Sequence, residues 1–293
     1  MSRPYYCQTE ELFLAALSAL PGLGPKRLSA LRNLGGSWEE VWRGKAELWQ
    51  EAGISFKIQA TWQEKKKLFS PPKLQKYLDA SHTFLISQQN PNYPRGFYQL
   101  ADAPLLLYAR GKWPADIKII SVTGSRQPSL HGLALTKKLI PPLVQQGYGL
   151  VSGLAIGIDA LAHRLSLEQN AYSLAILGSG LDRVYPAANR ELAAAIIQQE
   201  GLILSEYPPS APPLTANFIQ RNRLVAAIAE KLLVLEARLD SGSMRTARWA
   251  QKLGKELYAA PGKGLTPQAA GCHLLIQEGA KRITRVKDFP ANR

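Results

Sequence analysis

Short apolar runs alternate with helix-length stretches from about Phe84 to the end of the chain. Such runs, bounded by turn residues, are typical of buried parallel strands, and the helix-length stretches between them predict strand-helix-strand units. We therefore predict an α/β fold for residues 83–290, with an extended Rossmann-like, doubly wound and mostly parallel sheet. The predicted strands are Leu105–Tyr108, Ile117–Val122, Gly149–Val151, Ser173–Leu177, Leu202–Leu204, Leu232–Leu235 and Glu256–Ala260.

The segment 1–82 has short helical patterns and almost no strand signal, which predicts a small all-α domain. A glycine-rich turn, PGLG, separates the apolar stretches Leu12–Leu20 and Leu28–Leu34 and looks like a helix-hairpin-helix element. In such an element the turn presents backbone N–H groups to a phosphate, and Lys26 and Arg27 would add positive charge. A plain helical hairpin that packs on the rest of the protein explains the pattern equally well.

Two other features of this segment have simple structural interpretations. The spacing of Trp38, Trp42 and Trp49 predicts that they fill a small core. The run Lys65–Lys67 is interpreted as a solvated helix face or a linker.

Composition gives a globular protein with a polyanionic partner. The 293 residues are 46% hydrophobic, which is enough for two cores of ordinary size. A net charge of +14 favours nucleic acid or a membrane surface, and composition does not separate the two. No apolar run approaches the roughly 20 residues of a membrane span. Glu10 and Glu11 precede Leu12–Leu20 where a signal peptide would be basic, so an amphipathic helix is expected there.

The two cysteines, Cys7 and Cys272, are far apart in the sequence. They give neither a disulfide framework nor a multi-cysteine metal site, and we predict a cytoplasmic protein without a metal or cofactor.

The run Asn217–Arg223 is the most informative segment for function. It brings an aromatic ring, an amide and two guanidinium groups together, from Phe218, Asn222, Arg221 and Arg223. The run lies where a proline-rich loop becomes a helix, and the free N–H groups of a helix start attract anions. The sequence therefore predicts a site that stacks a base and binds phosphate oxygens.

The two arginines of this run point in nearly opposite directions on a helix, whereas Phe218 and Arg221 share a face. We expect one arginine to bind a ligand and the other to be paired internally. The alternative is an arginine cluster that only neutralises Glu206 or Glu236.

Loops rich in glycine and serine follow most of the predicted strands. Ligands of doubly wound sheets lie beyond the carboxyl ends of the strands, so these loops meet on one face. Together they predict an anion-binding face, although each alone is ordinary turn chemistry. The loops are Gly124-Ser125-Arg126, Ser152-Gly153, Gly178-Ser179-Gly180, Ser205-Glu206-Tyr207, Ser241-Gly242-Ser243 and Pro261-Gly262-Lys263.

The loop after the strand at residues 149–151 also has features of an enzyme site. Gly153 and Gly157 do not have dinucleotide-binding spacing and no Walker lysine follows, which disfavours dinucleotide or ATP binding. Asp159 and His163 are four residues apart on one helix face, which suits a general-base pair or half a metal site. A helix cap and a hydrogen-bonded core histidine are the simpler interpretation.

These motifs, in this order, resemble the DprA (Smf) family of DNA-processing proteins. The resemblance covers about residues 83–280, and the amino-terminal segment is more loosely similar to the family's sterile-alpha-motif-like or helix-hairpin-helix domain. The chain ends at Arg293, where family members usually continue into a winged-helix domain, so we expect that domain to be lacking. His131 and His273 stand where tyrosine and asparagine are common. The matching residues are Gly124 to Arg126, Ser152 to Ala155, Gly157 to Asp159, Ala162-His163, Gly178 to Asp182, Tyr185-Pro186, Asn189, Ser205 to Pro208, Phe218, Arg221 to Arg223, Ser241 to Ser243, Thr246-Ala247 and Pro261-Gly262.

The resemblance implies a non-catalytic recombination mediator of natural transformation. Such a protein binds and protects single-stranded DNA, tolerates or displaces single-strand binding protein, loads the recombinase RecA, and forms a homodimer through its Rossmann-like domain. Arg126 matches a family position that contacts DNA, and Phe218 with Arg221 or Arg223 belongs to the motif that lines the same pocket. Lys263 is a further basic candidate beside it. The apolar segment Leu274–Ile276 suits either a dimer contact or the core.

Two other function classes remain open. Related Rossmann-like enzymes hydrolyse nucleotides and resemble a P-G-G-x-G-T-x-x-E pattern with a catalytic glutamate. Here Ser241–Thr246 takes the place of that loop, and no carboxylate follows until Glu256. The third class is a scaffold whose basic charge serves solubility and partner docking.

Overall fold

The computed structural model describes residues 9–20, 22–44, 46–67, 69–114, 117–264 and 266–289. The chain forms two compact units, Met1–Tyr93 with Pro104–Ala109 and Pro94–Ala103 with Arg110–Arg293. The chain passes between the units more than once, and the single boundary expected after residue 82 stays a prediction.

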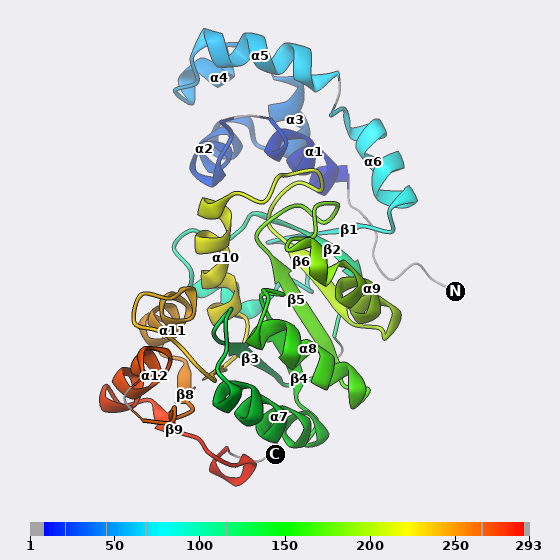
Figure 1. Ribbon diagram of the computed structural model, residues 1–293. Coiled ribbons are helices and arrows are strands. Elements are labelled where there is room, and N and C mark those ends of the chain that lie inside the picture. Colours follow the sequence, from blue (N-terminus) through cyan, green and yellow to red (C-terminus); the bar gives the residue numbers. More distant parts are fainter. Residues whose placement is uncertain are drawn as a thin grey trace. The chain divides into compact units, whose positions relative to one another are not determined.

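The first unit is built mainly from short helices (Figure 1). Pro25 and Pro71 start two of them at positions where a missing N–H costs nothing, and the Ser37 hydroxyl caps a third by accepting a hydrogen bond from the Glu40 N–H at 3.0 Å. Strand β1 (Phe84–Ser87) pairs antiparallel with β2 (Leu106–Gly111). The helices are α1 (Thr9–Ser18), α2 (Pro25–Gly35), α3 (Trp38–Arg43), α4 (Ala46–Glu51), α5 (Phe56–Lys66) and α6 (Pro71–Ala80).

Tryptophans form the predicted small core of this unit. Trp38 and Trp49 are buried, and the Trp49 ring meets Trp62 edge to face with 5.4 Å between centroids. The interpretation of the lysine run as a solvated face is wrong for Lys66. Its ammonium lies 4.0 Å from the Trp49 ring centroid and 4.9 Å from that of Trp42. The negative faces of the two rings attract the cation, and burial lowers the pKa of Lys66 to about 8.

The second unit contains a fully parallel sheet, as the apolar runs predicted. Its strand order is β6-β5-β4-β3-β7-β8-β9. The predicted α/β, doubly wound fold is confirmed. The structure also contains a short edge strand, β9, that the sequence did not predict. The strands are β3 (Ile119–Thr123), β4 (Gly149–Ser152), β5 (Ser173–Leu177), β6 (Leu202–Ser205), β7 (Lys231–Val234), β8 (Glu256–Ala259) and β9 (Lys281–Arg282).

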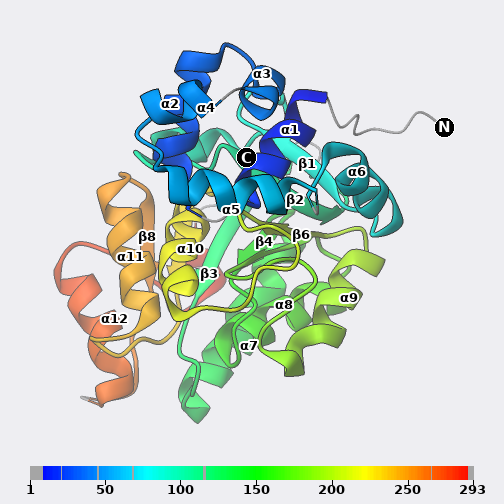
Figure 2. The same cartoon turned by 90° about the horizontal axis from the view of Figure 1, so that it is seen from above.

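Helices cover both faces of this sheet (Figures 1 and 2). Alternate residues of one strand supply the two cores: Leu233 packs with α7 and α8, whereas Leu232 and Val234 pack with α10, α11 and α12. Each strand is therefore buried on both sides, which is why its sequence is continuously apolar. The helices are α7 (Leu130–Gln145), α8 (Ile158–Glu168), α9 (Arg190–Gln198), α10 (Thr215–Ala227), α11 (Gly242–Lys252) and α12 (Pro267–Gln277).

The strand order places a topological switch point between β3 and β7. From β3 the chain adds β4, β5 and β6 on one side and then returns to add β7, β8 and β9 on the other. The loops that leave β3 and β7 diverge to opposite faces of the sheet and leave a crevice at their carboxyl ends. The architecture thus selects the loops after residues 123 and 234 as the place for a ligand.

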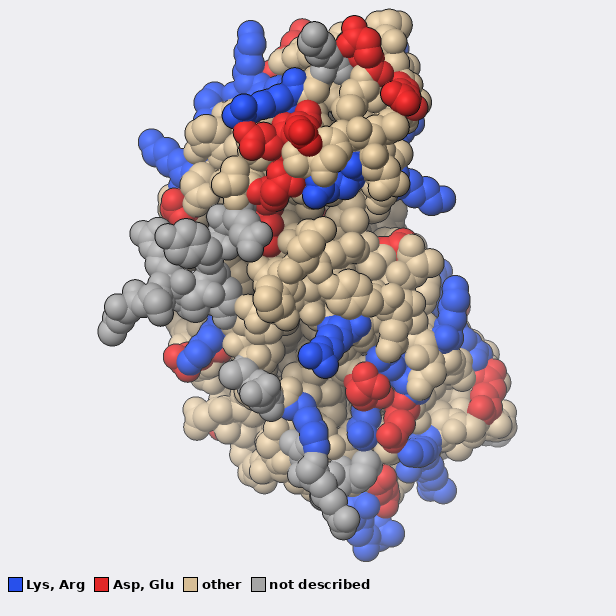
Figure 3. Space-filling model, turned by 180° about the vertical axis from the view of Figure 1, so that it is seen from behind, with Lys and Arg blue, Asp and Glu red and all other residues tan. Residues whose placement is uncertain are grey.

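The segment Leu274–Ile276 lies in α12 and belongs to the core. Leu275 is fully buried, and its two neighbours pack half-buried against the same cluster. Within the described ranges, no helix has both the length and the apolar character needed to cross a membrane. On the face seen in Figure 3, acidic side chains interrupt the basic ones.

Candidate nucleic-acid interface

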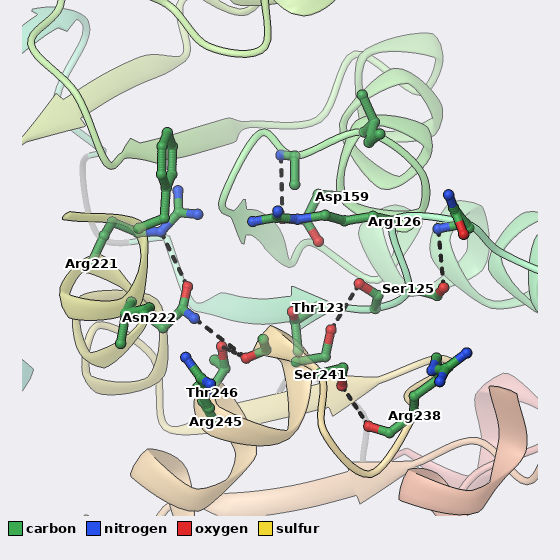
Figure 4. A pocket seen from close by; sticks show the side chains of 18 of the residues that line it. Thr123, Ser125, Arg126, Asp159, Arg221, Asn222, Arg238, Ser241, Arg245 and Thr246 are labelled. Atoms are coloured by element: carbon green, nitrogen blue, oxygen red, sulfur yellow. Dashed lines mark hydrogen bonds between the residues drawn. The ribbon is translucent and has the colours of Figure 1, made fainter. Parts of the chain in front are cut away.

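A pocket of about 650 Å³ lies at the carboxyl ends of β3 and β7. This volume is within the usual range for ligand sites. Its walls come from the loops after β3, β4 and β5, the starts of α8, α10 and α12, and the loop from β7 into α11 (Figure 4). The polar and charged residues of the lining are Thr123, Ser125, Arg126, Gln127, Asp159, Tyr185, Thr215, Arg221, Asn222, Arg238, Asp240, Ser241, Ser243, Arg245, Thr246 and Gln268.

The loop after β3 is held close to the surrounding backbone. A Cβ on Gly124 would lie 2.6 Å from three side-chain carbons of Ile158, so a larger residue would push the loop and α8 apart. The Gly124 carbonyl accepts a hydrogen bond from the Ser243 hydroxyl at 2.8 Å, which ties the loop to α11. The exposed Arg126 follows at the pocket wall, and no described carboxylate pairs with it.

The amino-terminal end of α11 forms the facing wall. The Ser241 hydroxyl accepts a hydrogen bond from the Met244 N–H at 3.3 Å and donates one to the Arg238 carbonyl at 2.7 Å. The positive end of the helix dipole therefore opens into the pocket beside Arg245. Arg245 is exposed and has no partner among the described side chains, whereas Arg238 lies 3.5 Å from Asp240.

Arg221 crosses the floor of the pocket and is bound by the protein itself. Its Nη1 donates to the Gly153 carbonyl at 2.6 Å and to the Ile176 carbonyl, so it joins the ends of β4 and β5. Only 3% of the residue is exposed. Burial, together with the charge of Arg126, lowers the pKa of Arg221 to about 10, which leaves it a cation at neutral pH. The neighbouring Asn222 donates to the Gly242 carbonyl at 3.3 Å and links α10 to α11.

Arg223 is the internally paired arginine that the sequence predicts. Its guanidinium binds the Glu206 carboxylate through two hydrogen bonds of 2.9 and 2.8 Å. It also donates to the Asp102 carboxylate at 2.9 Å and to the Asp102 carbonyl at 3.0 Å. The side chain is 2% exposed and is absent from the pocket lining. The alternative of neutralisation by Glu206 therefore holds for this arginine. Glu236 has another task, since its carboxylate accepts the Ser129 N–H at 3.0 Å where α7 begins.

His163 is the hydrogen-bonded core histidine of the structural interpretation, but the expected helix cap is wrong, because the N-cap of α8 is Gly157 and Asp159 binds the loop before the helix instead. The Asp159 carboxylate accepts hydrogen bonds from the Gly153 N–H at 3.1 Å and the Ala155 N–H at 3.4 Å. Burial raises the pKa of Asp159, and Arg221 opposes that shift. His163 is fully buried with Nδ1 2.7 Å from the Ser173 hydroxyl, and burial lowers its pKa to about 3. Within the described ranges no group of three acidic, histidine or cysteine side chains is arranged to hold a metal ion.

The structure brings nine predicted site residues together: Gly124, Ser125, Arg126, Phe218, Arg221, Asn222, Ser241, Gly242 and Ser243 line the pocket. Ser152 lies beneath it, fully buried, with its hydroxyl donating to the Val122 carbonyl at 2.7 Å. Gly153 lines a small adjoining cavity. Lys263 is exposed and does not belong to the described lining. Contact of these residues with DNA stays a prediction.

The candidate hairpin of the first unit has its own arrangement. Lys26 and Arg27 are both exposed, and the Arg27 Nη1 donates to the Gly22 carbonyl at 2.8 Å. Pro21 of this turn and Cys7 lie outside the described residues. The role of this hairpin in DNA binding stays a prediction.

Sequence reasoning did not name Arg238, Arg245, Ile156 or Tyr185 as site residues, although all four line the pocket. Arg245 was detectable, because it stands in the first turn of the helix that the Ser241-Gly242-Ser243 loop begins. Arg238 precedes the same loop by three residues. Ile156 comes from a loop whose course depends on tertiary packing, and no local pattern marks it. Tyr185 belongs to the matched Tyr185-Pro186 pair, but that match gave it no role in a pocket.

Comparison with known proteins identifies the family. Residues 84–292 match the family model described as DNA recombination-mediator protein A. The chain belongs to this family. Protein Smf of Synechocystis sp. is 34% identical over 282 residues, which are 94% of this chain and 70% of that protein.

Two solved structures of DprA proteins are similar to this chain. The X-ray structure of DprA from Streptococcus pneumoniae has a TM-score of 0.77 at 31% identity and covers 96% of both chains. The structure of DprA from Helicobacter pylori, which concerns the single-stranded DNA binding mode of that protein, has a TM-score of 0.62 at 32% identity. It covers 70% of this chain and 93% of the other.

His131 and His273 contact one loop. The His131 Nε2 lies 3.2 Å from the Pro261 carbonyl, and the His273 Nε2 lies 3.3 Å from the Gly262 carbonyl. Neither ring belongs to the described lining of the pocket.

Proposed function

We propose that this recombination mediator binds single-stranded DNA in the pocket between α10, α11 and the loop after β3. The observation that carries the proposal is that Arg126 and Arg245, on two walls of the pocket, pair with no carboxylate among the described residues and lie beside the amino-terminal end of α11. Cations without carboxylate partners beside free N–H groups suit phosphate oxygens. The binding described for the Helicobacter pylori protein supports the same choice of ligand.

Binding in this pocket depends on the backbone and on base stacking rather than on base sequence. Arginine–phosphate contacts release counterions from the strand, which makes affinity fall with salt. Phe218 is half-buried at the pocket wall and offers a face to any base.

The test is a titration of fluorescent oligo-dT across a salt series, with the wild-type protein, the Arg126→Ala variant and a matching duplex. We expect tight binding to the single strand, and the variant should bind more weakly with a slope of log affinity against log salt that is shallower by about 0.7. Preference for the duplex, no binding by the wild type, or an unchanged slope in the variant would each contradict this site.

The wider role that we propose is protection of incoming single strands and loading of RecA during natural transformation, by a homodimer that forms through the Rossmann-like unit. We place it in the cytoplasm, in line with two cysteines that are far apart in the sequence, Cys7 and Cys272. Strand exchange by RecA on DNA coated with single-strand binding protein tests the loading step, and light scattering tests the dimer. The loading proposal fails if this protein does not shorten the lag of strand exchange.

We propose that the pocket has no hydrolytic activity. Asp159 is the buried carboxylate of its lining, and its hydrogen bonds to the Gly153 and Ala155 N–H groups hold the backbone turn before α8. An assay for release of a free base from nucleoside monophosphates tests this. Product that is formed by the wild type and lost in Asp159→Asn would restore the enzyme alternative.

A further inference from the structure

One end of the pocket is apolar and aromatic. Tyr185 and Phe218 lie with their ring centroids 5.4 Å apart and their planes tilted by 47°. Ile156 lines the pocket beside them, and the same three side chains also line the small adjoining cavity. Tyr185 is 51% exposed and Ile156 is 45% exposed. These three residues, which we call the aromatic end, leave apolar surface in contact with water.

Phe218 is supported from behind by the end of β5. A Cβ on Gly178 would lie 2.6 Å from the Phe218 Cδ1 and 3.0 Å from its Cα, so the ring rests directly on the backbone there. One side of Phe218 is therefore used in protein packing. Tyr185 contributes the more exposed ring of the pair and the larger free face for a ligand.

Positive charge lies directly beside the aromatic end. Arg126 lines both the pocket and the small cavity together with Tyr185 and Phe218. A ligand that fits here has a flat π system and an anionic group next to it, which is the chemistry of a nucleotide. A lipid headgroup would supply the anionic group without the flat π system.

We propose that Tyr185, Phe218 and Ile156 form a subsite for one unstacked nucleobase of a single strand, with Tyr185 as the principal stacking ring. This inference rests on the proposed function and deepens it, because it separates a base end from the phosphate end at Arg245 and α11. Every base has a stackable face, so the subsite accepts any of them. It excludes duplex DNA, whose bases are already stacked on their neighbours.

The experiment compares Tyr185→Ala, Tyr185→Leu and Tyr185→Phe with the wild type on oligo-dT. Loss of a base-stacking ring lowers affinity by about 5- to 150-fold. We expect that loss in the Ala and Leu variants and near-wild-type binding in the Phe variant, with the salt slope unchanged in all three because no phosphate contact is removed. Phe56→Ala is the control, since Phe56 is an aromatic residue that is 69% exposed and belongs to the other unit.

A second arm uses the DNA as the variable. Each oligonucleotide of the series lacks the base at one position. The oligonucleotide that lacks the base held in the subsite should bind the wild type more weakly. The same missing base should lower the affinity of the Tyr185→Leu variant only a little further. The proposal is overturned if Tyr185→Leu binds like the wild type, or if the two losses are simply additive. Should Tyr185→Ala fail to fold, the Leu variant and the abasic series on the wild type decide the question. Absence of binding by the wild type would contradict the proposed function itself, a result that is distinct from wild-type binding without a Tyr185 effect.

Discussion

Arg223 and Glu206 form a two-pronged ion pair, with Nη1–Oε1 and Nη2–Oε2 distances of 2.9 and 2.8 Å. This geometry matches the planar guanidinium to the carboxylate and leaves Arg223 no free edge for DNA. Arg221, two residues earlier on α10, is bound by the backbone carbonyls of Gly153 and Ile176 instead. Both arginines of the most informative sequence segment therefore hold the pocket together from inside the protein.

Arg223→Ala is expected to destabilise the protein by about 3–5 kcal/mol, because it leaves Glu206 buried without its partner. Urea denaturation followed by circular dichroism measures this change. Arg126→Ala removes the same charge from an exposed position and should change the free energy of unfolding by less than about 0.5 kcal/mol. An Arg223→Ala variant with wild-type stability and weakened DNA binding would show that Arg223 is a ligand.

Arg221→Lys keeps the positive charge, but its side chain is shorter than that of arginine, whose terminal Nη1 donates to two carbonyls. One buried carbonyl then lacks its donor, which should cost about 1–3 kcal/mol of stability. We expect weaker oligo-dT binding, because Arg221 joins the ends of β4 and β5 at the floor of the pocket. The salt slope should be unchanged, because the charge is retained. Urea denaturation and the salt series measure both effects. A slope that falls as far as in Arg126→Ala would mean that Arg221 contacts phosphate directly.

The sequence predicted the sheet of the second unit because each strand is buried on both faces. Strand β9 escaped prediction, since Lys281 and Arg282 are exposed and have no apolar pattern. The glycine- and serine-rich loops located the site through the topology of parallel strands. Glu206 was among the partners that the sequence offered, but the carbonyls bound by Arg221, the Asp102 carboxylate bound by Arg223 and the rings beside Lys66 were not predicted, because residues distant in the sequence supply them.

Arg245→Ala should weaken oligo-dT binding and reduce the salt slope by about 0.7, because it removes one phosphate contact at the start of α11. The salt series measures both quantities. Arg248→Ala is the matched control: it removes the same charge from the same helix, but Arg248 pairs with Glu278 and does not line the pocket. Equal slopes for the two variants would indicate a general charge effect rather than a contact.

Lys66 should make the stability of the first unit depend on pH in the alkaline range. Its pKa is about 8 in the folded protein against 10.5 for an ordinary lysine, because burial disfavours the charged form. Between these values the unfolded chain binds more protons, so stability should rise as pH increases from about 8 to 10.5, and the full penalty for the buried charge remains below pH 8. The Lys66→Met variant has no ammonium group at this position, so its stability should lack this pH dependence.

The difference between the urea midpoints of the wild type and Lys66→Met should therefore shift in favour of the wild type between pH 7 and pH 10. Tryptophan fluorescence is a suitable probe, since Trp38, Trp42, Trp49 and Trp62 all belong to the first unit. Lys57→Met changes an exposed lysine of the same helix α5 and should track the wild type across this range. A pH-independent difference for Lys66→Met would mean that the attraction of the two indole rings for the ammonium offsets its desolvation, so that Lys66 titrates as an ordinary lysine.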